Sequence, residues 1–248
     1  MKNVIIGNFK MNYTASETSE YLEKFLPLVS DLNDKTIGLC VPYTSITIAI
    51  KKCKHSKVMV GAQNIHSEEK GSFTGEISGK MLKDLQTKLV IIGHSERRVL
   101  YGENDSLINK KLFQALKNGL TAILCIGENK TDRQNGKSLE VIENQLRMAL
   151  QDIYANELKS IIIAYEPVWA IGTGTSATEE QIKEVTVFIR KTIENMFNKD
   201  VAKEIKVLYG GSVNLNNAAK IFKIKQVDGA LVGGCCLIPE EFAALCKL

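Results

Sequence analysis

The chain has 248 residues, of which 44% are hydrophobic and 24% are charged, a balance typical of a globular protein with a large buried core. Its formal charge of +4 comes from 32 basic and 28 acidic residues spread along the chain. This mild excess suits a small anionic ligand but is too weak and too scattered to indicate nucleic acid as a partner. No apolar run approaches the length of a membrane span, so no membrane partner is expected.

The cysteines and the start of the chain predict a cytoplasmic protein. The six cysteines include no CxxC pair, so we expect them to be reduced and mostly buried. No His/Cys cluster has the spacing of metal ligands, and no metal is expected. The first apolar run is too short for a signal peptide. The final Cys246-Lys247-Leu248 resembles a peroxisomal Ser-Lys-Leu address, but we favour the end of an amphipathic helix.

Short runs rich in β-branched residues recur along the chain and predict eight strands. Most are apolar throughout rather than alternating, as expected for parallel strands covered by helices. The predicted strands span residues 4–6, 36–40, 58–62, 88–92, 121–126, 160–164, 206–209 and 229–232. Helix signals lie between them: two capping-box pairs, a helical periodicity over 104–118, and a stop at Gly119. The capping-box pairs are Thr14 with Glu17 and Thr178 with Gln181.

Eight strand-helix units of ~30 residues, without a linker, predict a single domain over residues 1–248, folded as a closed α/β barrel of the (β/α)8 type. An open doubly wound sheet is the alternative. We prefer the barrel because glycines typical of phosphate binding come late in the chain rather than after the first strand. One connection, residues 63–78, is far longer than the ~2–6 residues typical of such loops, and its tip at 73–76 predicts a partner surface.

A single carboxylate, Glu166, follows the sixth predicted strand directly. The loop behind it is stiffened by Pro167 and Trp169 and loosened by Gly172 and Gly174. A base followed by a hinged loop is what an enzyme needs if it abstracts a proton and then excludes water. The alternative is a glutamate at the edge of the sheet followed by an ordinary glycine-bearing loop.

Two glycine pairs follow the last two predicted strands. Gly210-Gly211 leads into Ser212 and a predicted helix at 214–222, and Gly233-Gly234 precedes one at 239–248. Exposed backbone N–H groups at helix starts bind anions, and barrels of this class hold phosphate at this place. The two pairs therefore predict a phosphate site, although glycines can also simply permit tight turns.

Two further side chains are expected at the same rim. His94 ends the fourth strand, and Ser95 is expected to cap a short helix whose dipole would keep His94 neutral, as a hydrogen-bond donor. Lys10, after the first strand, would supply fixed positive charge. Either residue could instead be an ordinary structural histidine or surface lysine. With Glu166 and a phosphate site, they indicate proton abstraction next to the carbonyl of a small sugar phosphate.

Motifs from one end of the chain to the other resemble those of the triosephosphate isomerase family, in the family's order. They are GNFKMN at 7–12, GAQN at 61–64, FTGE at 73–76, IGHSERR at 92–98, CIGE at 125–128, the loop at 164–175, YGGSV at 209–213 and DGALVGG at 228–234. The resemblance implies a TIM barrel that interconverts dihydroxyacetone phosphate and glyceraldehyde 3-phosphate in glycolysis and gluconeogenesis, with no cofactor or metal.

The resemblance also implies a role for each rim residue. Glu166 would transfer the proton, His94 and Lys10 would stabilise the enediolate oxygens, Asn8 would orient Lys10 and the substrate, and Glu96 would support the site. Backbone N–H groups of Gly172, Ser212, Gly233 and Gly234 would hold the phosphate. Cys125 matches a family cysteine near the base. Thr74 and Glu76 would insert beside the active site of a second subunit in a two-fold homodimer.

The chain departs from the family pattern at few positions. Phe9 replaces a usual tryptophan, Tyr13 stands where glycine is common, Cys235-Cys236 replaces alanine and serine, and Ile238 replaces a frequent lysine. The cysteine pair raises the question of sensitivity to thiol reagents. Two other functions are less consistent with the sequence. An aldolase with a Schiff-base lysine would need a lysine in the sixth strand, which has none. A non-catalytic binding protein would be expected to have lost at least one rim residue, and none is lost.

Overall fold

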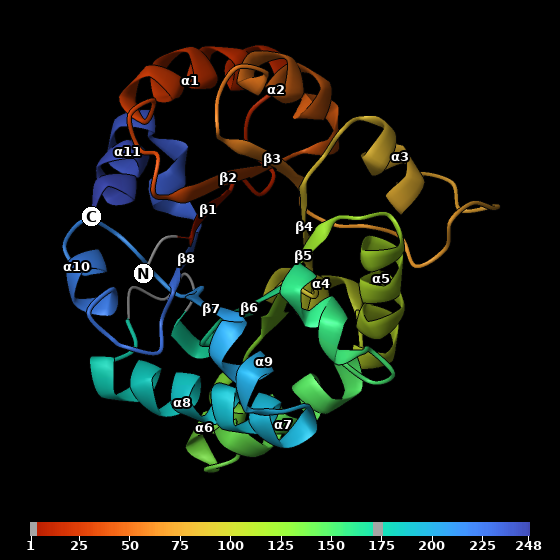
Figure 1. Ribbon diagram of the computed structural model, residues 1–248, viewed down its shortest axis with the longest axis vertical. Helices are drawn as coiled ribbons and strands as arrows, with labels where there is room; N and C mark the ends of the chain where they lie inside the picture. Colours follow the sequence, from red (N-terminus) through yellow and green to blue (C-terminus); the bar gives the residue numbers. More distant parts are fainter. Residues whose placement is uncertain (1–3, 171–175) are drawn as a thin grey trace.

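The computed structural model describes residues 4–170 and 176–248. Eight parallel strands are hydrogen-bonded in chain order, and the last pairs with the first, which closes the barrel seen in Figure 1. The strands are β1 (Val4–Asn8), β2 (Thr36–Val41), β3 (Met59–Ala62), β4 (Leu89–Ile92), β5 (Thr121–Ile126), β6 (Ile161–Tyr165), β7 (Lys206–Tyr209) and β8 (Gly229–Val232). The predicted TIM barrel is confirmed, and each strand lies where the apolar runs placed it.

The strands are apolar throughout because both of their faces are buried. In β5, Ile123 and Cys125 belong to a core cluster distinct from the one that takes up their neighbours Ala122 and Leu124. Successive side chains of a strand point to opposite faces, so one cluster fills the barrel and the other packs between strands and helices. This packing explains why the period-two alternation is missing from the sequence.

Helices cover the outside of the barrel (Figure 1). The α-helices are α1 (Ala15–Leu28), α2 (Ile46–Cys53), α3 (Gly79–Asp84), α4 (Ser95–Tyr101), α5 (Asp105–Lys117), α6 (Lys130–Gln134), α7 (Ser138–Ala149), α8 (Glu179–Met196), α9 (Lys199–Glu204), α10 (Ala218–Ile221) and α11 (Pro239–Lys247). The 3-10 helices are η1 (Tyr43–Ser45), η2 (Ala155–Ser160), η3 (Val168–Ala170) and η4 (Gly234–Leu237).

The local helix signals are confirmed. Reciprocal capping boxes begin α1 at Thr14 and α8 at Thr178. Helix α5 ends at Lys117 with Asn118 as its C-cap, and Gly119 takes the positive φ of +71° that the end of the helix requires.

The predicted helix at 214–222 is wrong in extent. Only Ala218–Ile221 is helical, because Asn214 and Asn217 turn the chain through side-chain hydrogen bonds to the backbone before it can begin.

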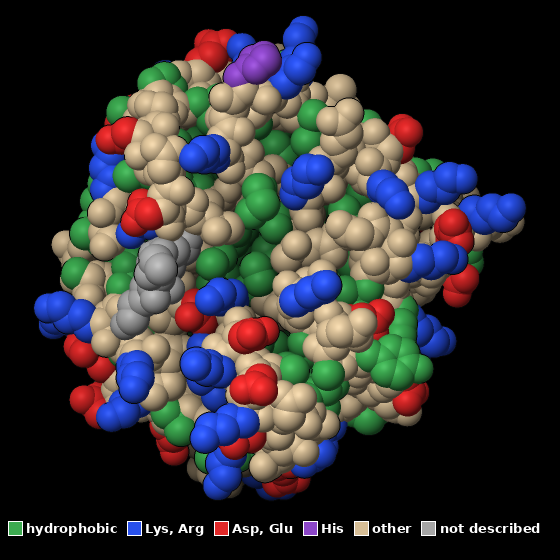
Figure 2. All heavy atoms as spheres, viewed as in Figure 1, with side chains coloured by type: hydrophobic (Ala, Val, Ile, Leu, Met, Phe, Trp, Pro, Cys, Tyr) green, Lys and Arg blue, Asp and Glu red, His purple; other side chains and the backbone are tan. Residues whose placement is uncertain are grey.

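The long connection between β3 and α3 extends away from the body of the barrel (Figure 1 and Figure 2). Residues 70–76 are all exposed, including Phe73, and the ring of Phe73 lies against His66 with centroids 4.2 Å apart. The segment is thus an ordered projection with an exposed aromatic side chain, as expected of a partner surface.

Candidate active site

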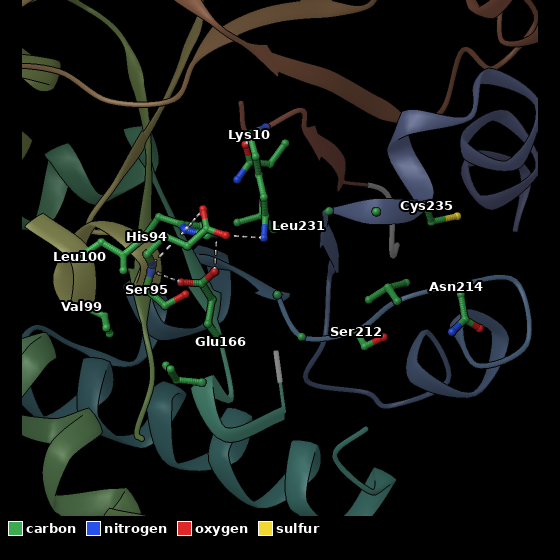
Figure 3. A pocket seen from close by; sticks show the side chains of 18 of the residues that line it. Lys10, His94, Ser95, Val99, Leu100, Glu166, Ser212, Asn214, Leu231 and Cys235 are labelled. Atoms are coloured by element: carbon green, nitrogen blue, oxygen red, sulfur yellow. Dashed lines mark hydrogen bonds and ion pairs between the residues drawn. The ribbon is translucent and has the colours of Figure 1, made fainter. Parts of the chain in front are cut away.

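A cavity of about 670 Å³ opens at the carboxyl ends of the strands. Its walls include Asn8, Lys10, His94, Glu96, Glu166, Ser212, Gly233 and Gly234, which come from the ends of five different strands (Figure 3). Parallel strands present their carboxyl ends at one rim, so residues far apart in the chain meet here. Of the predicted site residues, Thr74 and Glu76 lie on the projecting loop and not at this cavity. Gly172 lies outside the described residues.

Lys10 is held in an unusual backbone conformation, with φ at +52°. Its N–H donates to Asn8 Oδ1 at 3.0 Å, and its carbonyl oxygen accepts from Gln63 Nε2 at 2.8 Å. A non-glycine residue keeps a positive φ only where the surroundings determine it. Lys10 Nζ lies 2.7 Å from Glu96 Oε1, so the ammonium group is oriented at its far end as well. The lysine enters the cavity as a pre-positioned cation.

His94 begins the short helix α4 as its N-cap residue, the position that the sequence analysis gave to Ser95. Its Nδ1 accepts the N–H of Glu96 at 3.3 Å, which is possible only when Nδ1 carries no proton. In this tautomer the proton is on Nε2. The helix start therefore aims an Nε2–H group at the cavity.

Glu166 is positioned by its backbone and by both carboxylate oxygens. Its N–H donates to Ile126 at 2.8 Å, and a Cβ on Gly127 would lie 1.7 Å from the Glu166 carbonyl oxygen, so only glycine permits this approach. Oε2 accepts the N–H of Ser95 at 2.8 Å, and Oε1 lies 2.9 Å from His94 Nε2. Within residues 4–170 and 176–248, Oε1 accepts no hydrogen bond of good geometry. The carboxylate is only 1% exposed yet keeps one oxygen open to accept a proton.

The close contact with Glu166 changes the pKa expected for His94, which the sequence predicted to be neutral. Burial is the largest single influence and lowers the pKa of His94, but the Glu166 carboxylate and, to a smaller extent, Glu96 together raise it by more, so the net shift is upward. In the substrate-free protein, His94 therefore takes up a proton more readily than a free imidazole. Once Glu166 has accepted a proton from a substrate, its negative charge is gone, and burial then favours neutral His94.

The two glycine pairs differ in structure. Gly233 precedes the 3-10 helix η4, whereas Gly210-Gly211 leads through Ser212 into the turn before α10. A long α-helix therefore begins directly at neither pair. A Cβ on Gly233 would lie 3.6 Å from Lys10 Cε, so this turn and the lysine are neighbours. Backbone N–H groups beside a fixed cation suit an anion.

Sequence reasoning gave no role to Glu128, which is fully buried behind the start of the loop that follows Glu166. Its Oε1 accepts from Trp169 Nε1 at 2.8 Å, from Tyr165 at 3.2 Å and from Arg133 at 3.3 Å. The sequence did contain a signal for Glu128: it follows the end of a strand, two residues after β5, and Glu166 likewise follows the end of β6. Gln63 and Ser95 were likewise quoted in motifs but not predicted to hold Lys10 and Glu166.

Both cysteines of the pair are largely buried, although Cys235 lines the cavity. Cys235 and Cys236 are both buried, and Cys235 points away from the charged end of the cavity in Figure 3. Burial, followed by the nearby Glu241, raises the pKa of Cys235 to about 11, and burial raises the pKa of Cys236 further. Burial also raises the pKa of Cys125, and the Glu166 carboxylate adds to this, which places Cys125 beside the base. All three thiols stay protonated and react slowly.

Two other kinds of site are not found in the described part of the chain. In residues 4–170 and 176–248, no three His, Cys, Asp or Glu side chains group in a way that could hold a metal ion. Among the helices of the same residues, none combines the length and apolarity needed to cross a membrane.

Comparison with known proteins agrees with this geometry. Residues 3–248 match the family described as triosephosphate isomerase. The chain is 46% identical to a triosephosphate isomerase of Aquifex aeolicus over 99% of this chain and 98% of the relative. It is 44% identical to those of Acetivibrio thermocellus and Dictyoglomus thermophilum, over 99% of this chain and 98% and 99% of the relatives.

The chain belongs to the triosephosphate isomerase family. It is an enzyme, an isomerase of triose phosphates, as the resemblance of its motifs implied. Two of the departures from the family pattern pack against each other: Phe9 is fully buried and contacts Tyr13 edge to face at 5.2 Å between centroids. Glu166, His94 and Lys10 all line this one cavity.

Proposed function

We propose that this protein interconverts dihydroxyacetone phosphate and D-glyceraldehyde 3-phosphate by proton transfer through an enediolate, and that the rim residues carry out the individual steps. One observation carries the proposal: a buried carboxylate with an open oxygen lies 2.9 Å from an imidazole nitrogen, in a cavity that also holds a fixed cation. A base, a hydrogen-bond donor and a cation are what abstraction of a proton next to a carbonyl requires.

Glu166 is the base. Its Oε1 takes a proton from the carbon next to the substrate carbonyl, and the electron pair of that C–H bond forms the enediolate. The same carboxylic acid then returns the proton to the neighbouring carbon, while the hydroxyl proton on the oxygen of the first carbon passes to the oxygen of the second, so no co-reactant is consumed. The Ser95 N–H on Oε2 keeps the carboxylate oriented while Oε1 reacts.

His94 and Lys10 stabilise the oxygen atoms on which negative charge develops. Neutral His94 donates its Nε2–H, since Nδ1 is occupied by the Glu96 N–H. Lys10 supplies positive charge from a backbone that Asn8 holds in place, and Glu96 orients its ammonium group. Because these groups are positioned before substrate arrives, little reorganisation is needed in the transition state.

The phosphate is held by backbone N–H groups of Ser212, Gly233 and Gly234. Two observations support this phosphate site. The turns at the carboxyl ends of β7 and β8 line the cavity, and the positively charged Lys10 lies beside Gly233. Gly172, predicted to add a fourth N–H group, lies outside the described residues.

We further propose that residues 1–248 form one domain, that the protein is a cytoplasmic homodimer, and that Thr74 and Glu76 insert beside the partner's active site. The exposed projection at residues 70–76 supports the dimer. A second cavity, of about 530 Å³, lies beside Lys10, His94 and Glu96 and is lined by Met11 and Tyr101, which are 97% and 68% exposed. An exposed apolar recess next to the site suits an inserted loop.

Purified protein in coupled assays of both directions tests the reaction. We expect turnover of both triose phosphates, unchanged by a metal chelator. Absence of turnover in both directions would reject the proposal. Inactivation by borohydride in the presence of substrate would indicate instead a Schiff-base lysine.

A further inference from the structure

The loop that carries Lys10 and the turn that carries the phosphate-binding glycines lie against each other. A Cβ on Gly233 would be 3.6 Å from Lys10 Cε and 3.9 Å from Lys10 Nζ. In the proposed function both segments contact the same small substrate. Their relative position therefore decides whether the Lys10 ammonium group and the backbone N–H groups of the turn can bind it at the same time. Whatever joins the two segments therefore acts on substrate binding.

Tyr13 joins them. It lies three residues after Lys10, and its hydroxyl donates a hydrogen bond to the carbonyl oxygen of Leu237, the last residue of η4. Carbonyl groups at the end of a helical turn have no partner within it, so the hydroxyl supplies one. Tyr21 does the same from α1, donating to the carbonyl oxygen of Cys236 at 2.8 Å.

The backbone of Tyr13 is strained, with φ at +70°. A bulky residue in this region is uncommon and strained, unlike the glycine that often stands here in the family. The strain is sustained by packing: the ring lies edge-on to Phe9 and 5.8 Å from Tyr21 between centroids. A side chain that costs backbone energy and ends on the phosphate turn is a candidate for function.

We propose that Tyr13 is a positioning residue that holds the turn at residues 233–237 in place against Lys10 and so sets the affinity for the phosphate group. This inference rests on the proposed phosphate site at Gly233 and Gly234. Tyr13 touches none of the reacting atoms. Its effect falls on binding through the turn.

The substitution Tyr13→Phe keeps the ring and removes only the hydroxyl. We expect KM for either triose phosphate and the inhibition constant of inorganic phosphate to rise together by about 3- to 10-fold, the effect of one hydrogen bond of ~1 kcal/mol. We expect kcat to stay within about two-fold, since the groups at the reacting carbons are untouched. Turnover of glyceraldehyde, which lacks the phosphate, should not change.

Tyr154→Phe is the matched control, since Tyr154 is 74% exposed and lines none of the cavity, and it should alter none of these constants. Tyr13→Gly relieves the positive φ and also removes the hydroxyl. It should remain folded and weaken phosphate binding at least as much as Tyr13→Phe, so a folding defect in one variant cannot hide the result.

Two results would overturn the inference. One is a lower melting temperature for Tyr13→Phe with unchanged KM and phosphate inhibition, which would make the hydroxyl merely structural. The other is an equal loss on glyceraldehyde and triose phosphate, which would place its effect at the reacting carbons. Amide NMR signals of Gly233 and Gly234 in the unsubstituted protein test the underlying site separately: if neither shifts on addition of inorganic phosphate, the proposed phosphate site itself is wrong.

Discussion

The role of Glu166 is tested most directly by shortening its side chain. In Glu166→Asp the carboxylate retreats by one carbon–carbon bond, about 1.5 Å. The shorter group cannot both accept the Ser95 N–H at 2.8 Å and keep its other oxygen 2.9 Å from His94 Nε2. A misplacement of ~1 Å costs about 10²-fold in rate, which corresponds to ~2.7 kcal/mol in the activation barrier.

The fold should tolerate this change. One buried methylene is lost from a side chain that is 1% exposed, at a cost of ~0.8 kcal/mol in unfolding free energy and about 3 °C in melting temperature. Turnover should therefore fall by about 10²-fold in a protein that remains folded at the assay temperature. Coupled assays in both directions measure kcat, and deuterium uptake from D2O into substrate measures proton abstraction separately from product release.

Two further variants sharpen the test. Glu166→Gln keeps the length of the side chain but cannot accept the proton, so we expect a larger loss, toward the upper end of the ~10²–10⁴-fold attributed to general bases. Glu194→Asp makes the same shortening on the exposed surface of α8 and should leave kcat unchanged. A kcat for Glu166→Asp within two-fold of the unsubstituted protein, with normal deuterium uptake, would show that another group is the base.

Three other predictions concern the surroundings of the base. Because Glu166 raises the pKa of His94, NMR titration of the free protein should show His94 charging above the ordinary ~6.5, and Glu166→Gln should lower that pKa, since burial and Lys10 are then opposed by Glu96 alone. Because the pKa of His94 is higher in the folded than in the unfolded protein, protonation of His94 stabilises the fold below pH ~6.5, and this stabilisation is lost as the pH rises through the folded-state pKa. An unchanged His94 pKa in Glu166→Gln would refute the coupling between the two residues. Replacing residues 71–77 with a short turn should give a monomer with greatly reduced turnover, measured by sedimentation and coupled assay, and a fully active monomer would disprove the link between dimer and site. Substituting Cys235→Ala and Cys236→Ser together should leave the rate of inactivation by a bulky thiol reagent unchanged, since both thiols are buried and protonated, whereas marked protection would show that one of them is reachable.

Much of this protein follows from local sequence patterns. Apolar runs located all eight strands, because a strand buried on both faces must be apolar throughout. The capping boxes at Thr14 and Thr178 depend on residues three apart and were therefore visible in the sequence. The side chains that meet in the cavity could be named in advance, since a closed parallel barrel brings strand carboxyl ends to one rim.

Tertiary structure alone decided how those residues are held. The Ser95 N–H reaches Glu166, Gln63 reaches the Lys10 carbonyl, and Tyr13 reaches Leu237, across sequence separations of 71, 53 and 224 residues. No local pattern encodes such pairs, because each depends on the curvature and closure of the whole barrel. The same reason governs the upward shift in the pKa of His94, which depends on a carboxylate brought in from a strand two positions away around the barrel. The sequence determines which groups reach the rim, and the closed barrel determines their mutual distances and their protonation.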